Sequence, residues 1–352
     1  MPQGVRHGSQ ADTHRRDDDA IVRIGPLMGI PALLQEFGHE PGPVIGSVGL
    51  TPGQFTDPDI EISYIAAGQL LAHCVALTGC EHFGLMLGMS AGPSSLGVAG
   101  FMLRSAPDVG NALRGLVQHL DLHDQGGAAT LLIRGSETLL GYAIHQSGVK
   151  AADQIYDLAI AVGCNIMRAL CGKAWKPAEV LLSHRQAQDL APYRRFFRSP
   201  LRFNADQCAM VFPTHWLDQR NPAADTLLHR HLEREASHLH NLRKTGLASE
   251  LRVMLRKSLA AGSCASGDIA RQLHMHERTL NRKLHEEGTS FHRELDAIRY
   301  TMARQFLAES AMPIARIARA LNYAEVSAFS RAFKRWAGVS PAQWRKRRQT
   351  SA

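Results

Sequence analysis

Hydrophobic residues recur at helical spacing twice in the last hundred positions, in two copies of one short pattern that lie 48 residues apart. In each copy, a first helix carries an isoleucine and a leucine four positions apart, and a second helix carries two large apolar residues at the same spacing. These residues are Ile269, Leu273, Leu280 and Leu284 in the first copy, and Ile317, Leu321, Phe329 and Phe333 in the second. Because two short helices that cross after a tight turn form a helix-turn-helix unit, the pattern predicts two such units.

A third helical pattern lies between the two units, over residues 291–309. Its length corresponds to a rod of roughly 28 Å, close to the roughly 34 Å between successive major grooves on one side of B-DNA. One chain could therefore place two recognition helices in successive grooves. Ser266, Pro313 and Ser340 stand where helices are expected to begin. Since no strand pattern follows Phe212, we expect an all-α C-terminal domain of two helix-turn-helix units joined by a long helix.

The first half of the chain mixes helical and strand patterns without the strict alternation of a parallel α/β fold. Helical spacing covers residues 63–77, 107–122 and 151–171. Strand patterns cover residues 128–133, 138–145, 179–183 and 209–212. The first two strands flank Gly135 and predict a β-hairpin. This mixture predicts an α+β sensor domain.

A chain of 352 residues is long enough for two domains, each with its own core. We expect a disordered tail at 1–20, which offers little to bury, and an effector-binding, regulatory domain at 21–218. A polar helical linker is expected at 219–245, with its helical pattern starting near Asn221. Its leucines, together with the apolar sensor helices, offer a surface for a homodimer. The double helix-turn-helix domain is expected at 246–349.

Positive charge is concentrated near the C-terminus. Residues 243–352 carry 21 Lys and Arg against 9 Asp and Glu, a net charge of +12, whereas the whole chain carries +8. Residues 1–242 therefore carry a net charge of −4. A basic domain beside an acidic one indicates a polyanion partner, and the helix-turn-helix repeat identifies double-stranded DNA as that partner. A solvated basic face is the alternative that the charge alone allows.

The six cysteines are scattered without a Cys-x-x-Cys pair, which is typical of reduced, buried thiols. The first 20 residues lack the apolar core of a signal peptide, and no stretch approaches the ~18 to 20 apolar residues of a membrane span. We therefore expect a cytoplasmic protein with no membrane partner. We also expect no cofactor and no metal, because no two linker histidines stand three or four residues apart, as two ligands on one helix do. These histidines are His229, His231, His238 and His240.

Exposed positions on the second helix of each unit are candidates for reading bases. Arginine binds guanine, and asparagine binds adenine, through two hydrogen bonds that contribute about 1 to 3 kcal/mol of discrimination. The candidates are Arg278, Asn281, Arg282 and His285 in the first unit, and Val326, Ser327, Ser330 and Arg331 in the second. Arg347 and Arg348 belong to a basic C-terminal run and are expected to contact phosphates, which position a protein without specifying sequence.

The second unit also carries a longer motif. It comprises Pro313-Ile314, Ile317-Ala318, Leu321-Asn322-Tyr323, Phe329-Ser330-Arg331-Ala332-Phe333-Lys334, Gly338-Val339-Ser340-Pro341 and Trp344-Arg345. This motif resembles the C-terminal signature of AraC/XylS-type transcription regulators. Two positions depart from the signature. Asn322 replaces the usual glycine and must adopt a left-handed turn, for which asparagine is the next-best residue, and Trp344 replaces the usual tyrosine.

Short motifs in the first half carry a second resemblance. They are Leu85-Met86-Leu87-Gly88, Leu96-Gly97-Val98-Ala99-Gly100-Phe101, Ser105-Ala106-Pro107, Ala112-Leu113-Arg114, Tyr193-Arg194-Arg195-Phe196-Phe197 and Val211-Phe212-Pro213. They are similar to the subset of these regulators that has an arabinose-binding-like sensor domain and includes ornithine-utilisation regulators. The resemblance implies that a small-molecule effector binds the sensor, which controls DNA binding or contact with RNA polymerase. We therefore expect a sequence-specific transcription activator that is not an enzyme, with its effector left open.

A polar cluster ends the helical pattern at 107–122. It contains His119, Asp121, His123 and Asp124. An exposed helix end is the favoured interpretation, and the alternative is the polar end of an effector site, with His119 and His123 as contacts. Arg104 lies in an apolar run, where it either pairs with an anionic effector or is an ordinary loop arginine.

Gly88-Met89-Ser90-Ala91-Gly92 matches the nucleophile elbow of serine hydrolases. An elbow needs a strand before the serine and a helix after it. Here residues 81–87 have a helical pattern and 92–95 a loop pattern, which disfavours an esterase. A hydrolase with a DNA-binding tail and a non-specific architectural DNA-binding protein are the two alternative functions. A comparison of Ser90→Ala with wild type on ester substrates tests the first, and the lack of a preferred DNA site would indicate the second.

Overall fold

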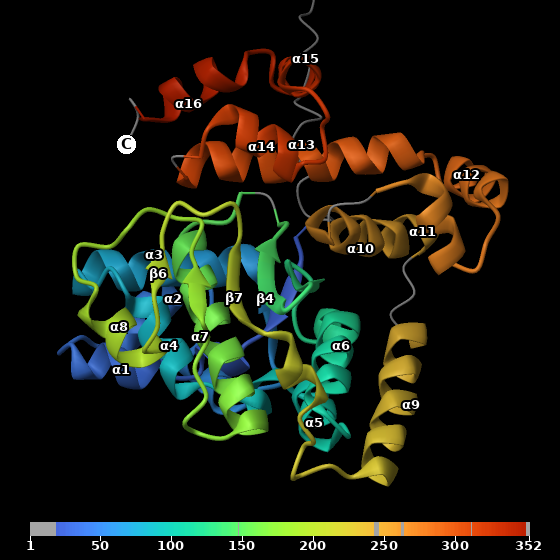
Figure 1. Cartoon of the computed structure of the whole chain (residues 1–352). Coiled ribbons are helices and arrows are strands. Elements are labelled where there is room, and N and C mark those ends of the chain that lie inside the picture. The colour runs from blue at the N-terminus through green and yellow to red at the C-terminus, as the bar shows by residue number, and fades with distance from the viewer. Residues whose placement is uncertain (1–18, 147, 243–245, 262–263, 311, 350–352) are drawn as a thin grey trace, which may run out of the picture.

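The computed structural model describes residues 19–146, 148–242, 246–261, 264–310 and 312–349 (Figure 1). The tail predicted at 1–20 lies outside these residues except for Asp19 and Ala20. The predicted fold class is confirmed. Strands and helices mix as far as Pro213, and the described residues beyond it contain helices and no strand.

A five-stranded sheet forms the centre of the sensor region, in the order β3-β4-β7-β5-β6. The strands are β3 (Gly127–Arg134), β4 (Glu137–Ile144), β5 (Glu179–Leu181), β6 (Leu201–Arg202) and β7 (Cys208–Pro213). Neighbouring strands are antiparallel except β5 and β6. The predicted hairpin is confirmed, since Ile133 pairs with Thr138 across a turn in which Gly135 has a φ of 61°. A glycine is favoured there because it has no Cβ to clash.

Helices surround this sheet. They are α1 (Ile30–Glu36), α2 (Pro41–Gly46), α3 (Tyr64–Thr78), α4 (Phe83–Ser90), α5 (Val98–Ser105), α6 (Val109–His119), α7 (Ala152–Cys171) and α8 (Ala191–Phe197). Helix α7 packs against β4, β7 and α4. Gly84 lets α4 approach closely, because a Cβ there would lie 2.1 Å from the backbone oxygen of Gln154. The helices predicted at 63–77 and 151–171 are confirmed to within one residue.

The helix predicted at 107–122 is shorter in the structure. Helix α6 begins after Asp108, whose Oδ1 accepts a hydrogen bond of 2.7 Å from the backbone amide of Asn111. This cap places Pro107 outside the helix. The α-helix ends at His119, and a 3₁₀ turn, η4 (Leu120–Leu122), continues the chain. A two-stranded sheet of β1 (Ile21–Arg23) and β2 (Glu61–Ser63) was not predicted, because three-residue strands show too little alternation.

A buried ion pair links α7 to the loop after β5. The Nε2 of His184 lies 2.9 Å from Oδ1 of Asp157, its Nδ1 lies 2.9 Å from the backbone oxygen of Arg185, and Tyr193 donates to Asp157. Both ring nitrogens of His184 face acceptors, which favours the protonated ring. Burial lowers the pKa of His184, but the Asp157 carboxylate more than offsets this effect, and the pKa is raised to about 9.

This pair predicts that the sensor loses stability in mild alkali. The pKa of His184 is higher in the folded chain than its unfolded value of 6.5, so its contribution is complete below pH 6.5 and is lost as pH rises through about 9. The free energy of unfolding should fall by up to about 3 kcal/mol over this range. Urea titrations at several pH values measure it, and His184→Gln should flatten the profile while His215→Gln should not. An unchanged slope in His184→Gln would refute the assignment.

The C-terminal region consists of eight helices within the described residues. They are α9 (Thr226–Leu242), α10 (Gly246–Ala261), α11 (Ser266–Gln272), α12 (Glu277–Glu286), α13 (Phe291–Glu309), α14 (Ile314–Ala320), α15 (Val326–Ala337) and α16 (Pro341–Gln349). The linker helix α9 begins at Thr226 rather than near Asn221, because Asp225 caps it by accepting hydrogen bonds from the amides of Leu227 and Leu228. Figure 1 shows α9 standing beside α5, and α10 beside the upper end of the sheet.

Candidate nucleic-acid interface and sensor pocket

The first helix-turn-helix unit consists of α11 and α12. Its core contains Ile269, which is 1% exposed, and Leu280 and Leu284, which are fully buried. The opposite face of α12 is open to solvent and carries all four predicted side chains: Arg278, Asn281, Arg282 and His285. Arg282 already forms an ion pair within the helix, since its Nη1 lies 2.5 Å from Oε1 of Glu286 one turn later.

The second unit consists of α14 and α15. Ile317, Leu321, Phe329 and Phe333 are fully buried. On the other face of α15, Val326, Ser327 and Arg331 are exposed, and Ser330 is half-buried. Arg347 is exposed on α16, whereas the side chain of Arg348 lies outside the described part of the chain.

The turns of the two units have the same backbone conformation. Asn322 has a φ of 57°, so the predicted left-handed turn is confirmed. His274, 48 residues earlier, has a φ of 52° at the equivalent position. The repeat therefore extends to a conformation that L-residues rarely adopt. Neither residue is glycine, the residue that adopts this conformation most easily.

Two of the three predicted helix starts are confirmed. Pro313 precedes α14 as its cap residue, and Ser340 caps α16, where its Oγ accepts a hydrogen bond of 3.3 Å from the amide of Gln343. The third was wrong by one position. Ala265 is the cap residue of α11, and Ser266 is its first helical residue, with a hydroxyl that donates to Glu277 instead of accepting from the helix.

The long helix α13 spans Phe291–Glu309, as predicted, and holds both units. Near its start, Glu294 accepts a 2.6 Å bond from Nε of Arg252 on α10. Further along, Asp296 accepts bonds from Arg335 and from Trp336 of α15. In Figure 1, α11 and α12 lie near one end of α13, and α14 to α16 lie along its other half. The two exposed recognition faces are thus fixed to one rigid rod.

Arg299 of α13 also fixes the turn of the second unit. Its Nε donates to the backbone oxygen of Leu321 at 3.0 Å, and its guanidinium lies 4.5 Å from the centre of the Tyr323 ring. This cation–π contact and hydrogen bond surround Asn322 on both sides. The arginine therefore positions the turn of the second unit.

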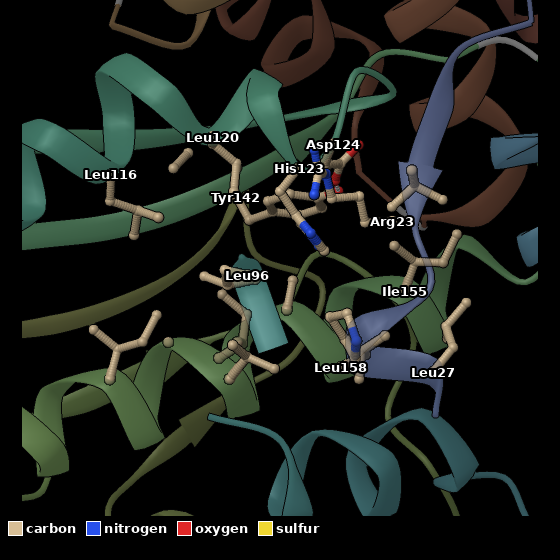
Figure 2. A pocket seen from close by; sticks show the side chains of 18 of the residues that line it. Arg23, Leu27, Leu96, Leu116, Leu120, His123, Asp124, Tyr142, Ile155 and Leu158 are labelled. Carbon is tan, nitrogen blue, oxygen red and sulfur yellow. Dashed lines mark hydrogen bonds between the residues drawn. The ribbon is translucent and has the colours of Figure 1, made fainter. Parts of the chain in front are cut away.

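The sensor region contains a pocket of about 110 Å³ between α3, α7, the β1 strand and the β3–β4 hairpin (Figure 2). Most of its walls are aliphatic, with side chains such as Leu71, Leu116, Leu140, Leu158 and Ile166. Five residues with polar groups also line it. They are Arg23, Tyr64, His123, Asp124 and Tyr142.

The polar groups of the pocket form a connected network. Oδ1 of Asp124 accepts bonds of 2.8 and 2.9 Å from the amides of Gly126 and Gly127, and Tyr142 donates to its other oxygen. The hydroxyl of Tyr64 lies 2.8 Å from that of Tyr142. Burial raises the pKa of Asp124 to about 6 even though these hydrogen bonds lower it. The carboxylate is therefore satisfied by the protein itself.

His123 stands apart from that network. It is 5% exposed, and its Nδ1 has no hydrogen-bond partner among the described residues. Burial, and after it the charge of Arg23, lowers the pKa of His123 to about 3, so the ring is neutral near pH 7. The Nη1 of Arg23 is 2.5 Å from Oδ1 of Asp59, and its Nε donates to the backbone oxygen of Leu122. Figure 2 shows His123, Asp124 and Tyr142 grouped together among aliphatic side chains.

The three predicted effector contacts lie in different places. His123 lines the pocket, and Asp124 beside it does as well. His119 is buried outside the pocket lining, with its ring 5.4 Å from that of His240 on α9. Arg104 is exposed in the last turn of α5. Arg23 and Tyr142 were not identified from the sequence, because the chain brings them together only through pairings of distant segments.

Ser90 does not occupy a nucleophile elbow. It is the last residue of α4, and its hydroxyl donates to the backbone oxygen of Leu87, one turn earlier in the same helix. An elbow requires a strand before the serine. The local geometry therefore removes the observation on which the hydrolase alternative rested.

No single helix in the described ranges has the length and hydrophobicity of a membrane span. Taken together, α3 and α4 have enough apolar residues, but the axes of these two helices are bent by 114°.

Comparisons with known proteins cover both regions. Residues 38–221, more than half of the chain, match the family described as the arabinose-binding domain of AraC transcription regulators, and residues 269–347 match a helix-turn-helix domain family. The chain is 28% identical to the HTH-type transcriptional regulator VirS of Mycobacterium tuberculosis and 25% identical to the ornithine utilization regulator of Pseudomonas aeruginosa. Each alignment covers 93% of this chain and 96% of the relative.

Among solved structures, the transcriptional regulator CdpR of Pseudomonas aeruginosa aligns with 89% of this chain and 98% of its own, at 20% identity and a TM-score of 0.41. The family match to the sensor region and the second match to the helix-turn-helix region occur in the order that the fold shows. The named relatives are transcriptional regulators and not hydrolases. The chain belongs to the AraC family of transcription regulators, with an arabinose-binding-like N-terminal domain and a C-terminal helix-turn-helix domain that binds DNA.

Proposed function

We propose that this regulator activates transcription by reading a DNA site made of two short elements, under the control of a small molecule bound in the sensor pocket. The observation that carries the proposal is the pair of exposed recognition faces, on α12 and α15, fixed to the single rod α13. Arg278, Asn281 and Arg282 read the first element, together with His285. On α15, Arg331 binds a guanine. Val326, Ser327 and Ser330 contact thymine methyl groups and read the shape of the groove.

Arg282 must leave Glu286 before it can bind a base. The pair is exposed, with the two side chains 64% and 57% accessible, so breaking it costs less than about 1 kcal/mol. A bidentate contact with guanine offsets that cost. The ion pair therefore holds Arg282 along α12 in free protein without preventing DNA binding. Arg347 and Arg348 bind phosphates and contribute affinity for any sequence.

The pocket is connected to the DNA-binding half through the segment 120–124. Residues of this segment line the pocket, whereas Asp121 faces α9, where its Oδ2 is 2.8 Å from Nε2 of His240. Leu122 packs against Ala236 of the same helix. An effector that shifts the segment therefore shifts α9, which leads directly into the DNA-binding domain. One direct contact between the domains, the ion pair of Arg316 and Asp206, is half-exposed and therefore weak enough to yield.

A variant that fills the pocket tests the effector role. Ala159 lies on α7 and lines the pocket, whereas Ala169 is exposed on the same helix. Ala159→Leu should abolish the response of a reporter driven by the bound promoter, because the added carbons occupy the ligand volume. Ala169→Leu is the matched control and should respond as wild type does. A full response from Ala159→Leu would show that the effector binds elsewhere.

A second variant tests the route to DNA. Asp121→Ala removes the contact with His240 but lies outside the pocket lining. The reporter response should fall about threefold to fivefold, because coupling energies of this kind are on the order of 1 kcal/mol. Effector affinity measured by calorimetry should stay near the wild-type value, and the exposed Asp218→Ala should change neither quantity. A normal response in Asp121→Ala would exclude this route.

Three further features complete the proposal. Activation requires contact with RNA polymerase, and the double-stranded DNA partner and the family's regulatory role support a cytoplasmic location.

The chain also forms a homodimer through α5 and the start of α9. This surface is supported by three exposed apolar side chains, Phe101, Leu227 and Leu228, which are 49%, 76% and 45% accessible. Analytical sedimentation of Leu227→Asp and of wild type tests this surface. The variant should sediment as a monomer, and a variant that dimerises as wild type does would exclude the surface.

A further inference from the structure

The chemistry of the pocket narrows the class of effector, on the basis that the pocket is the effector site of the proposed function. We propose that the effector is a small, uncharged and mainly apolar molecule with a single hydrogen-bonding oxygen, which binds Nδ1 of His123. The size of the pocket, the hydrogen bonds of its polar groups and the charges at its polar end support this ligand class.

Size limits the part of the ligand that the pocket encloses. A cavity of about 110 Å³ is somewhat smaller than an engineered apolar cavity of roughly 150 Å³ that binds benzene. The enclosed part of the ligand is therefore about one small ring or a short branched chain. Its neighbours, such as Leu71, Leu116 and Leu158, provide dispersion contacts and no hydrogen bonds.

One buried nitrogen in the pocket lining lacks a hydrogen-bond partner among the described residues. Asp124 receives three hydrogen bonds from the protein, one of them from Tyr142, and Tyr142 also contacts the hydroxyl of Tyr64. By contrast, Nδ1 of the buried His123 has no partner among the residues that the structure describes. A neutral imidazole nitrogen either donates or accepts, according to its tautomer, and a ligand hydroxyl suits both cases. A sugar fits poorly because most of its hydroxyls would lose water and face aliphatic walls.

Charge at the polar end excludes ionised ligands. The guanidinium of Arg23 is paired with Asp59, and Asp124 also lines the pocket. A carboxylate ligand would therefore meet a cation that already has a counterion, together with the buried carboxyl group of Asp124. An ammonium ligand would lose its hydration beside Arg23, and the oxygens of Asp124 are already occupied by donors of the protein. A neutral ligand avoids both costs.

Four probes with one aromatic ring test this class by calorimetry on the full chain at pH 7: benzyl alcohol, toluene, benzoate and benzylammonium. Benzyl alcohol should bind at least about tenfold more tightly than either ion, and about threefold to tenfold more tightly than toluene, which is the range of one hydrogen bond. His123→Leu should remove the preference of the alcohol over toluene. Ala159→Leu should abolish binding of both, while Ala169→Leu keeps it.

The outcomes separate the ligand class from the effector role. Pocket-dependent binding of benzoate or benzylammonium as tight as that of benzyl alcohol would overturn the class, as would a preference for the alcohol that survives in His123→Leu. Absence of binding by all four probes would overturn it too. A different result would exclude the pocket as the effector site: a normal reporter response in Ala159→Leu, whichever probe binds.

Discussion

The double variant Arg282→Ala/Arg331→Ala should bind its cognate DNA on the order of 10² to 10⁴ times more weakly than wild type. Each arginine lies exposed on a different recognition helix, so each loses an independent bidentate contact of about 1 to 3 kcal/mol. The two losses should add, because the two arginines belong to different helix-turn-helix units. Fluorescence anisotropy on the cognate site and on random DNA measures both affinities.

The control for this variant is Arg347→Ala/Arg348→Ala, which removes the same number of positive charges. Because phosphate contacts carry no sequence information, this control should weaken cognate and random DNA by similar factors and should reduce the salt dependence of both. The base-reading pair should instead reduce the ratio between cognate and random affinity. An equal loss on both DNAs in Arg282→Ala/Arg331→Ala would mean that these arginines only neutralise phosphates.

Phe333→Ala should destabilise the helix-turn-helix domain by about 3 to 5 kcal/mol, the usual loss when a buried phenylalanine is truncated. Phe333 is fully buried on α15, and its ring lies 5.9 Å from that of Phe329, 5.8 Å from Tyr300 of α13 and 6.2 Å from Trp344 of α16. The cavity would therefore open where three helices meet. This loss is a large fraction of the roughly 5 to 15 kcal/mol by which native domains are stable.

Thermal unfolding followed by circular dichroism, together with DNA binding at 25 °C, measures the effect. Ile133→Ala is the control, since Ile133 is 55% exposed on β3 and its truncation should cost less than about 1 kcal/mol. A Phe333→Ala protein with the wild-type unfolding temperature would contradict the packing described for α13, α15 and α16.

The sequence predicts the C-terminal half well because its signals are local. Leu280 and Leu284, or Phe329 and Phe333, stand one helical turn apart, so the buried face of each recognition helix follows from spacing alone. The bounds of α13 follow from Ser290, whose hydroxyl accepts from the amide of Arg293, and from the apolar spacing after it. At Ser266 the predicted start of α11 is wrong by one residue, because the hydroxyl of Ser266 bonds to Glu277 instead of capping the helix.

The pocket could be predicted only in part, because it is built from distant segments. His123 and Asp124 attract notice as a polar pair after a helix, but Arg23 joins them through a bond to Leu122 that spans 99 residues. Tyr64 and Tyr142 meet across 78 residues. These contacts depend on the short strand pair β1–β2 and on the packing of α3 beside the hairpin, neither of which leaves a strong local pattern.

The most direct test of two-element DNA reading is the selection of genomic fragments by the purified full-length chain, sequenced at low and at moderate salt. We expect a recurrent site of two short elements with centres about one helical turn, roughly 34 Å, apart, retained at moderate salt. In fragments selected by the single variants Arg282→Ala and Arg331→Ala, one of the two elements should be missing, and a different one in each variant. Fragments without a common motif, released as salt rises, would contradict the account and leave a basic domain that binds DNA by counterion release alone.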